Sequence, residues 1–233
     1  SRLVCDQSMS FYDQQINLNE INDRLSVLGF APINRDDNWR PDKPVLVCDD
    51  IGYLSLTKGD AAYVDAADLP LVAGFNWHIF SKKNTSYAMV ALRATDGSWR
   101  KLLLHRLLMV PEAGLVVDHI DGNGLDNRRS NLRTCSNAEN SRNRRKAKGG
   151  TSSSFKGVAR FRNGWQAQII VDGKNLYLGR YQDEHEAALA YDAAAVEHFG
   201  EYALTNAGLG LLAVQRSELL PVNDNVSPLN AVA

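Results

Sequence analysis

Cysteine and long apolar runs are the scarcest features of this 233-residue sequence. Its three cysteines are Cys5, Cys48 and Cys135, and none lies in a C-x-x-C pair, so a structural zinc site is not expected. Their odd number and wide spacing predict reduced, mostly buried thiols, as in a cytosolic protein. No apolar run is long enough to cross a membrane, and no basic-then-apolar start predicts a signal peptide.

Charge is nearly balanced over the whole chain but not along it. The formal net charge is −1, yet residues 126–181 carry 13 Lys and Arg against 3 Asp and Glu, while the first 100 residues carry 10 against 13. A basic stretch is often only a solvated face, but basic side chains also neutralise phosphates and supply most non-specific affinity for DNA. Nucleic acid is therefore the expected partner.

One stretch, residues 115–140, combines turn chemistry with metal-binding residue types. Residues 115–120 (LVVDHI) predict a strand, and the Asp-Gly-Asn-Gly that follows predicts a sharp loop. Residues 132–135 can pair back as a second strand, and Ser136 and Glu139 have the spacing of a capping box at a helix start. We therefore expect strand, loop, strand and helix, with the helix start folded against the end of the first strand.

Three side chains of this unit suit metal-assisted phosphodiester hydrolysis. Carboxylate and amide oxygens are ligands that Mg²⁺ and Mn²⁺ prefer, and Asp118 and Asn140 supply one of each. A neutral histidine is the usual base for an attacking water, and His119 points to the other side of the strand from Asp118. The pattern predicts one divalent cation, Mg²⁺ or Mn²⁺, on Asp118 and Asn140, with His119 as the general base.

The segments DHIDGN from Asp118, NL from Asn131 and EN ending at Asn140 resemble the HNH nuclease motif in its phage and homing-endonuclease form. The resemblance implies that Asp118 and Asn140 bind one divalent metal, that His119 activates water and that Asn131 braces the loop. Many HNH motifs end in His, and Asn140 matches the homing-type variant. LHRLLM before the motif also resembles this family, which makes His105 a second candidate active-site residue, with a structural or phosphate-contacting role as the alternative.

The DHIDGN segment alone is also typical of an ordinary tight turn. Its combination with NL and with a capped helix that bears Asn140 is what favours the functional interpretation. An EF-hand is excluded, because the Asp and Gly positions do not match D-x-[DN]-x-[DN]-G.

The sequence before the motif divides at residue 44. In residues 1–44 an apolar stripe that ends at Gly29 predicts a helix, packed on its own protein or, alternatively, on a partner; the stripe consists of Phe11, Leu18, Ile21, Leu25 and Leu28. Residues 35–44 predict a linker. The expected nuclease domain is residues 45–148, whose short segments predict a small sheet: 45–50, 53–56, 61–65, 86–92 and 101–109.

A basic stretch continues the capped helix and leads into a linker. Its side chains are expected to contact DNA; they are Arg142, Arg144, Arg145 and Lys146. Residues 149–154 (GGTSSS) predict a flexible linker, which lets two domains act on the same DNA.

Residues 155–206 predict a second, smaller domain. Three strands with turns at Asn163-Gly164 and Asp172-Gly173 precede an Ala-rich helix from Asp183 to Gly200. One sheet face is expected to pack on the helix, while the other is free to enter a DNA groove. Residues 207–233 predict a tail.

This second region resembles the plant ethylene-response-factor (APETALA-type) DNA-binding domain over nearly its whole length, in FKGV, W-x-A-x-I, YLGRY, EAALAYDAAA and ALTN. The resemblance implies a set of DNA-facing side chains: Lys156, Arg162, Gln168, Asn175 and Tyr177, with Arg160 nearby. Ala159 and Ile170 stand where the plant pattern has Arg, so base preference does not carry over.

Together these features predict an α+β chain, with a ββα-metal HNH nuclease domain followed by a small three-stranded antiparallel sheet and one helix. The expected function is a metal-dependent DNA endonuclease of the homing type, acting on double-stranded DNA in a bacterial or phage-infected cytoplasm, with a monomer favoured. The alternative is a non-catalytic DNA-binding transcriptional regulator in which the ββα unit is only a scaffold.

Overall fold

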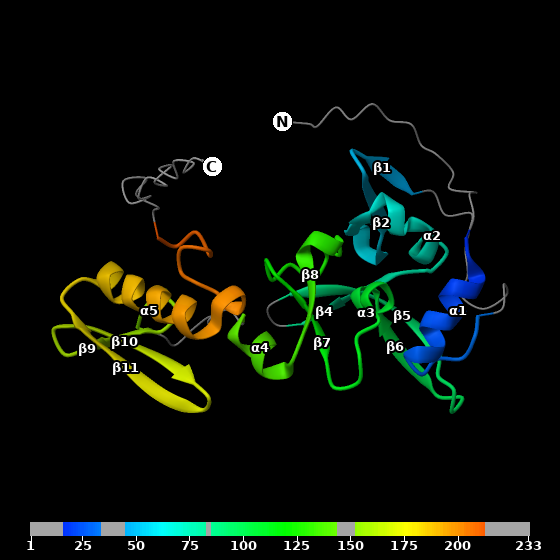
Figure 1. Cartoon of the computed structure of the whole chain (residues 1–233). Coiled ribbons are helices and arrows are strands. Elements are labelled where there is room, and N and C mark those ends of the chain that lie inside the picture. The colour runs from blue at the N-terminus through cyan, green and yellow to red at the C-terminus, as the bar shows by residue number, and fades with distance from the viewer. Residues whose placement is uncertain (1–15, 34–44, 83–84, 144–151, 213–233) are drawn as a thin grey trace, which may run out of the picture. The chain divides into compact units, whose positions relative to one another are not determined.

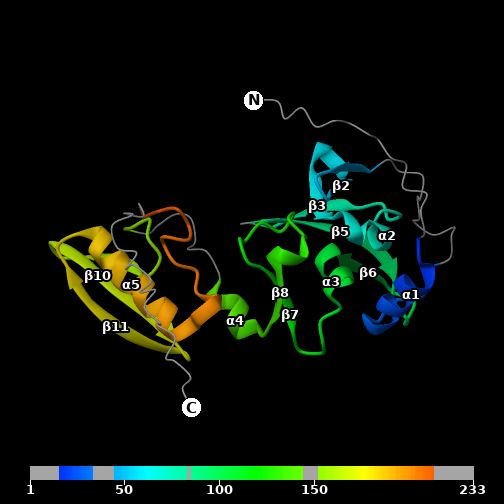
Figure 2. The same ribbon diagram turned by 45° about the horizontal axis from the view of Figure 1, so that its top comes forward.

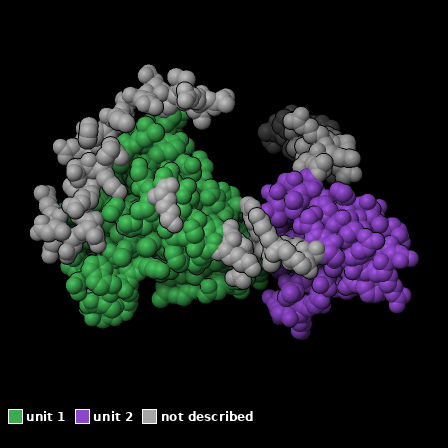
Figure 3. Space-filling view, turned by 180° about the vertical axis from the view of Figure 1, so that it is seen from behind, with its two compact units in different colours: residues 1–145 green, residues 146–233 purple. Residues whose placement is uncertain are grey.

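The computed structural model describes residues 16–33, 45–82, 85–143 and 152–212 (Figure 1 and Figure 2). The chain forms two compact units, residues 1–145 and 146–233, which are coloured separately in Figure 3. Several earlier predictions lie wholly or partly outside the described ranges: Cys5, Phe11 in the helical stripe, the 35–44 linker, the basic residues Arg144, Arg145 and Lys146, part of the 149–154 linker and most of the tail. Within those ranges no helix has the length and hydropathy needed to span a membrane.

Unit 1 is built from several small antiparallel sheets and short helices. The strands, in sheet order, are β1 (Leu46–Cys48), β2 (Ile51–Ser55) and β3 (Ala61–Asp65); β4 (His78–Ser81), β5 (Ser86–Arg93) and β6 (Trp99–Leu103); and the pair β7 (Val116–His119) and β8 (Leu132–Cys135). The helices and 3-10 turns are α1 (Leu18–Val27), η1 (Thr57–Gly59), η2 (Ala66–Asp68), α2 (Leu69–Val72), α3 (Leu104–Met109), η3 (Arg129–Asn131) and α4 (Asn137–Arg142). One apolar core packs most of these elements together and contains the buried Phe75 and Trp77, whereas α4 contributes no side chain to it.

Helix α1 follows the rules that its sequence predicts. The Asn17 side chain caps its start by accepting a hydrogen bond from the Glu20 amide at 3.2 Å, and Gly29 follows its end with a φ of +79°. Ile21 and Leu25 on one face are fully buried in the core. The predicted helix is therefore confirmed over its described part, and its apolar face packs on its own protein.

The segment 101–109, predicted as a strand, changes type in its middle. Strand β6 ends at Leu103, and helix α3 begins at Leu104. Its buried side chains recur at helical spacing: Leu104, His105, Leu107 and Leu108. A short apolar run does not distinguish a strand from a buried helix, which is why the strand prediction was wrong here.

The cysteine prediction is confirmed for Cys135, a buried free thiol. It is wrong for Cys48, which is disulfide-bonded. Whether two cysteines meet depends on the distance between their backbones in the fold, and spacing along the sequence does not report that distance.

Unit 2 is a three-stranded antiparallel sheet with one helix, as predicted. Its elements are β9 (Val158–Phe161), β10 (Gly164–Val171), β11 (Lys174–Tyr181), α5 (Glu184–Phe199) and the turn η4 (Gly200–Tyr202), with β10 in the middle of the sheet. Helix α5 covers one sheet face (Figure 2). Its cap residue Asp183 accepts hydrogen bonds from the amides of His185 and Glu186 at 2.7 and 3.1 Å. Ala167 and Ala187 are fully buried between sheet and helix, and these small side chains allow close packing.

Leu25→Ala should lower the free energy of unfolding by about 2–5 kcal/mol, because it leaves a cavity where a fully buried side chain packs. Urea unfolding of the whole chain measures the change. Val27→Ala, on the same helix but 71% exposed, is the matched control and should change stability by less than about 0.5 kcal/mol. Equal effects of both substitutions would show that α1 does not pack as described.

Candidate active site

The loop between β7 and β8 is held by the side chain of Asn131. Its Oδ1 accepts a hydrogen bond from the Asp121 amide at 3.0 Å. Its Nδ2 donates to Asp121 Oδ1 and to the Asp126 carbonyl oxygen, both at 2.9 Å. One side chain therefore ties the start of the loop to its middle and to the beginning of β8.

The same loop is anchored to the first two sheets. The Tyr63 amide of β3 donates to the Leu125 carbonyl at 2.8 Å, and the Asn127 amide donates to the Tyr63 carbonyl at 2.7 Å. The Gly124 amide donates to Thr85 Oγ1 at 3.0 Å. A Cβ at Gly124 would meet the Tyr87 ring at 2.6 Å, so only glycine fits this close approach to β5.

Asp118 has one carboxylate oxygen engaged and one open. It lies opposite Arg133 in the β7–β8 register. Its Oδ2 accepts hydrogen bonds from Arg133 Nε and Nη2 at 3.1 and 2.9 Å, and from Asn143 Nδ2 at 2.9 Å. Oδ1 accepts no hydrogen bond from any described residue. Oδ1 is not fully buried, although Asp118 as a whole is only 7% exposed.

His119, the next residue, shows the same division between its two ring nitrogens. Nε2 lies 3.4 Å from Asn127 Oδ1. Nδ1 makes no hydrogen bond to any described residue, and it is not fully buried. Burial lowers the pKa of His119 below its ordinary 6.5, against the opposing effects of the Asn127 hydrogen bond and nearby carboxylates. The ring is therefore neutral at pH 7, as a general base must be.

His105 and Tyr87 pack around the His119 ring. The His105 and His119 centroids are 4.9 Å apart with the rings edge to face, and the Tyr87 centroid lies 5.5 and 5.7 Å from them. Burial, followed by the neighbouring His119 and Arg106, lowers the pKa of His105 to about 3, and its Nδ1 is buried without a partner. A neutral, enclosed His105 offers no cation to a phosphate, which favours the structural alternative for this residue.

Helix α4 carries the last residue of the predicted set, Asn140. The predicted capping box is confirmed, because the Glu139 amide donates to Ser136 Oγ at 3.2 Å and the Ser136 amide donates to Glu139 Oε2 at 2.7 Å. The Asn140 side chain makes no hydrogen bond to any described residue. Asn143, three residues later, reaches the site instead, since its Nδ2 donates to Asp118 and to the His119 carbonyl at 3.0 Å.

Sequence reasoning missed Asn143 and Arg133, although both had a signal. Asn143 is three residues from Asn140 and so lies on the same helical face. Arg133 becomes the partner of Asp118 once the two strands are paired in register. Of the predicted basic side chains, Arg142 lies half-buried in the last turn of α4, whereas Arg144, Arg145 and Lys146 lie outside the described residues.

In unit 2, the sheet face away from α5 gathers polar side chains. In the strand register Gln168 of β10 lies opposite Tyr177 of β11, and Gln166 lies opposite Arg180. Gln168 Oε1 accepts hydrogen bonds from Gln166 Nε2 at 3.3 Å and from Asn175 Nδ2 at 3.0 Å. Tyr177 is 55% exposed. The structure therefore brings together the predicted Gln168, Asn175 and Tyr177 on one open surface.

Three arginines of unit 2 lie near the rings of Phe161 and Trp165. Arg180, missed in the YLGRY segment, stacks on Phe161 with its guanidinium 4.1 Å from the ring centroid, and the predicted Arg162 lies 5.5 Å from the same ring. Arg160 instead pairs with Trp165, and its guanidinium lies 5.4 Å from that ring. Trp165 packs against the core under α5. Its strand partner Arg160 therefore lies on the α5 side of the sheet, away from Gln168 and Tyr177.

Lys156 precedes β9 and is half-buried. Burial lowers its pKa to about 8, against the opposing effect of Asp192 on α5. Its charge is therefore weaker at mildly alkaline pH than that of an exposed lysine.

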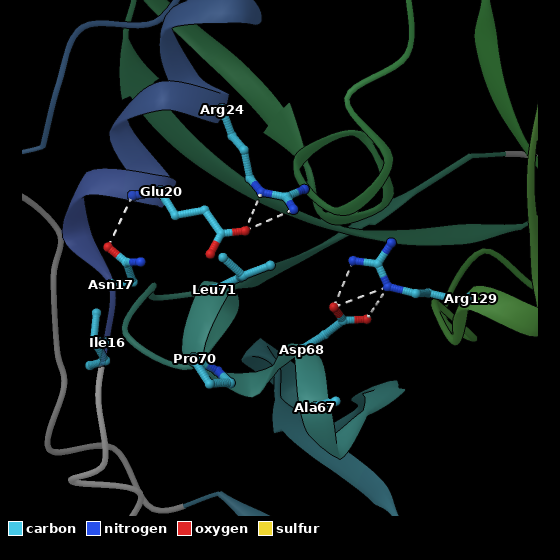
Figure 4. A pocket seen from close by; sticks show the side chains of 9 residues that line it. All are labelled: Ile16, Asn17, Glu20, Arg24, Ala67, Asp68, Pro70, Leu71 and Arg129. Atoms are coloured by element: carbon cyan, nitrogen blue, oxygen red, sulfur yellow. Dashed lines mark hydrogen bonds and ion pairs between the residues drawn. The ribbon is translucent and has the colours of Figure 1, made fainter.

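A pocket of about 620 Å³ lies elsewhere in unit 1, between α1, the segment of η2 and α2, and Arg129 (Figure 4). Its charged side chains pair with one another, Arg24 with Glu20 at 3.0 Å and Arg129 with Asp68 at 2.7 Å. Neither Asp118 nor His119 lines it. This pocket is therefore separate from the candidate active site.

Comparison with known proteins identifies the family. Residues 109–142 match the family described as HNH endonuclease. An uncharacterised HNH endonuclease of Acanthamoeba polyphaga mimivirus is 31% identical over 172 residues, which cover 69% of this chain and 83% of that protein. This chain belongs to the HNH endonuclease family. The prediction of a nuclease is thereby confirmed, and the HNH match spans Asp118, His119, Asn131 and Asn140.

The HNH chain is also similar to plant transcription factors over a shorter length. An AP2-like ethylene-responsive transcription factor of Arabidopsis thaliana is 43% identical over 77 residues, or 31% of this chain and 21% of that protein. A second ethylene-responsive transcription factor of the same plant is 50% identical over 58 residues, or 23% of this chain and 14% of that protein. The chain thus spans about a fifth of the first plant protein and less of the second.

The buried His105 should make the stability of this HNH unit depend on pH. Its folded-state pKa of about 3 lies below the ordinary 6.5, so between these values the unfolded chain binds more protons and stability falls as the pH is lowered. His105→Phe keeps an aromatic ring but has no titrating group at this position. When the pH is lowered from about 6.5 to about 4.5, the Tm of this variant should therefore fall less than the Tm of wild type.

Calorimetry at several pH values tests this expectation. Tyr87→Phe leaves the His105 imidazole in place and should keep the pH dependence of the wild type. If His105→Phe and wild type lost stability equally on acidification, His105 would not be the buried neutral group described.

Proposed function

We propose that this chain is a metal-dependent DNA endonuclease of the homing type, with a ββα-metal site formed by Asp118, His119, Asn131 and Asn140. The observation that carries the proposal is the shared geometry of Asp118 and His119. Each has one polar atom held by the fold, Oδ2 or Nε2, and one that stays open, Oδ1 or Nδ1. Adjacent residues thus offer an open carboxylate oxygen and an open ring nitrogen.

His119 acts as the general base in the proposed reaction. Water attacks phosphorus and the bond from phosphorus to O3′ breaks, leaving a 5′-phosphate and a 3′-hydroxyl. His119 Nδ1 accepts a proton from the attacking water, and the departing O3′ takes a proton from solvent. Burial lowers the pKa of His119 and favours the neutral imidazole near neutral pH, so one ring nitrogen is free to accept a proton.

The donor set fits one divalent cation. Asp118 Oδ1 and the Asn140 amide oxygen are hard ligands of the kind that Mg²⁺ and Mn²⁺ prefer, and neither is used by a hydrogen bond within the described chain. When bound, the cation neutralises charge on the scissile phosphate and the leaving oxygen. Arg133 and Asn143 orient Asp118 through its other oxygen, and Asn131 braces the loop.

We further propose that residues 155–206 are an ethylene-response-factor (APETALA-type) DNA-binding domain, linked by residues 149–154 to the nuclease domain of residues 45–148. The similarity to plant transcription factors and the open polar face of the β9–β11 sheet support this role. A sheet face can lie in a DNA groove, where amides and arginines contact bases and phosphates. The tether then raises the effective concentration of the nuclease on bound DNA.

His119→Ala should reduce cleavage of supercoiled plasmid by about 10²- to 10⁴-fold, because a general base contributes that much to the rate. Asp118→Ala should also abolish cleavage, and a chelator should stop the wild type. DNA affinity of the His119 variant should stay close to wild type, since binding rests on basic and sheet residues. His198→Ala, an exposed histidine on α5, is the control and should cut normally.

The products distinguish the possible outcomes of this assay. Metal-dependent nicked or linear plasmid that needs both residues would support the proposal and show whether one or both strands are cut. Cleavage unchanged by His119→Ala would refute the base assignment. Salt-sensitive binding without cleavage of any DNA would favour the non-catalytic regulator.

Arg180→Ala should weaken binding of the full chain to duplex DNA and lower the slope of log affinity against log salt by about 1, because one phosphate contact is lost. Fluorescence anisotropy at several salt concentrations measures both quantities. Leu189→Ala, exposed on α5, is the control and should leave the slope unchanged. An unchanged slope for Arg180→Ala would remove Arg180 from the proposed DNA surface.

A further inference from the structure

Asn127 is a buried amide outside the set that HNH resemblance assigns. Its side chain is completely enclosed, with 0% exposure. Its backbone amide donates to the Tyr63 carbonyl on β3 at 2.7 Å, which fixes the residue to a neighbouring sheet. Among the described residues its side chain makes hydrogen-bonding contacts with the Leu125 carbonyl oxygen and the His119 ring.

The orientation of this amide is determined by the Leu125 carbonyl. Asn127 Nδ2 donates to that oxygen at 3.0 Å. A carbonyl oxygen only accepts hydrogen bonds, so a flipped amide would set two acceptors against each other and lose the bond. The Asn127 Oδ1 must therefore face His119.

The orientation of Asn127 in turn selects the tautomer of His119. Oδ1 only accepts hydrogen bonds, and His119 Nε2 lies 3.4 Å from it. In a neutral imidazole one nitrogen carries the proton and the other a lone pair. With the proton on Nε2 the contact is a hydrogen bond, whereas with the proton on Nδ1 it would oppose two lone pairs in a buried place.

We propose that Asn127 is a positioning residue that keeps the proton of His119 on Nε2 and so leaves the lone pair on Nδ1. Nε2 is occupied by Asn127, whereas Nδ1 has no hydrogen bond to a described residue and is not fully buried, so Nδ1 is the nitrogen left for water. The Tyr87 and His105 rings pack against the imidazole, with centroids 5.7 and 4.9 Å from its own. This inference rests on the proposed function only for its consequence, the readiness of His119 to accept a proton from water.

Nitrogen-15 NMR of the full chain labelled at histidine tests the proposal, because long-range couplings to the ring protons distinguish the two neutral tautomers. The spectrum is recorded near pH 7.5, and His119→Gln identifies the signal. Wild type should show the Nε2–H form. Asn127→Ala should lose this preference and give a mixture or the other form.

Two further variants separate positioning from folding. Asn127→Asp keeps an acceptor facing Nε2 and should retain the Nε2–H form. Asn123→Ala is the matched control, because its exposed side chain accepts from the Leu125 amide in the same loop and does not touch His119. It should also retain that form, and melting curves establish that each variant is folded.

Single-turnover cleavage then tests the consequence. Asn127→Ala should slow the chemical step by about 10- to 100-fold, the usual cost of losing a residue that orients a group at a metal site, with DNA affinity unchanged. A wild-type ring in the Nδ1–H form, or an Asn127→Ala ring identical to wild type, would overturn the proposal. If the tautomer changed as expected but neither His119→Ala nor Asn127→Ala slowed cleavage, the positioning would stand and the base role in the proposed function would fail.

Discussion

The three hydrogen bonds of the Asn131 side chain are the constraint on which the HNH site depends. Strands β7 and β8 have four residues each, and so short a two-stranded ladder is not stable by itself. By binding Asp121 and the Asp126 carbonyl, Asn131 closes the loop that joins them and holds their register. Tyr63 on β3 and Thr85, just before β5, add further anchors to the same loop. Several elements of unit 1 thus hold the loop between β7 and β8 in place.

Adjacent residues of β7 lie in different environments, because different side chains contact Asp118 and His119. Asp118 Oδ2 accepts hydrogen bonds from the guanidinium of Arg133 and the side-chain amide of Asn143, and these two partners fix the orientation of the carboxylate. His119 meets the rings of Tyr87 and His105, and this apolar burial disfavours a charged imidazole. A buried ion pair usually adds little net stability to a fold, because desolvation of both charges offsets their attraction. The role of Arg133 is therefore to orient the carboxylate of Asp118. The proposed metal ligand and the proposed base thus occupy two different environments on adjacent residues.

Local sequence rules predicted the parts of the site that depend on neighbours along the chain. The capping box of Ser136 and Glu139 and the strands flanking the loop follow from residue types a few positions apart, and both are found. The residues that reach across the fold were not predicted. Asn143 contacts Asp118 because of how α4 packs against β7, and the helix beginning at Leu104 forms because four buried side chains face a core built elsewhere. Such contacts depend on tertiary packing, which a single sequence does not display.

Helix α1 belongs physically to the nuclease fold, although it precedes the motif by about a hundred residues in the chain. The Arg24 guanidinium donates to the carbonyl oxygens of Leu107 and Leu108 at 3.2 and 2.8 Å, and so satisfies acceptors at the end of α3 that the helix itself leaves unpaired. Helix α3 carries His105, whose ring packs on His119. Arg24 of α1 thus contacts the helix whose His105 packs on His119, so the position of the His119 ring depends on a residue in the first described helix. The catalytic motif is therefore short in sequence, but the structure that orients it extends over most of unit 1.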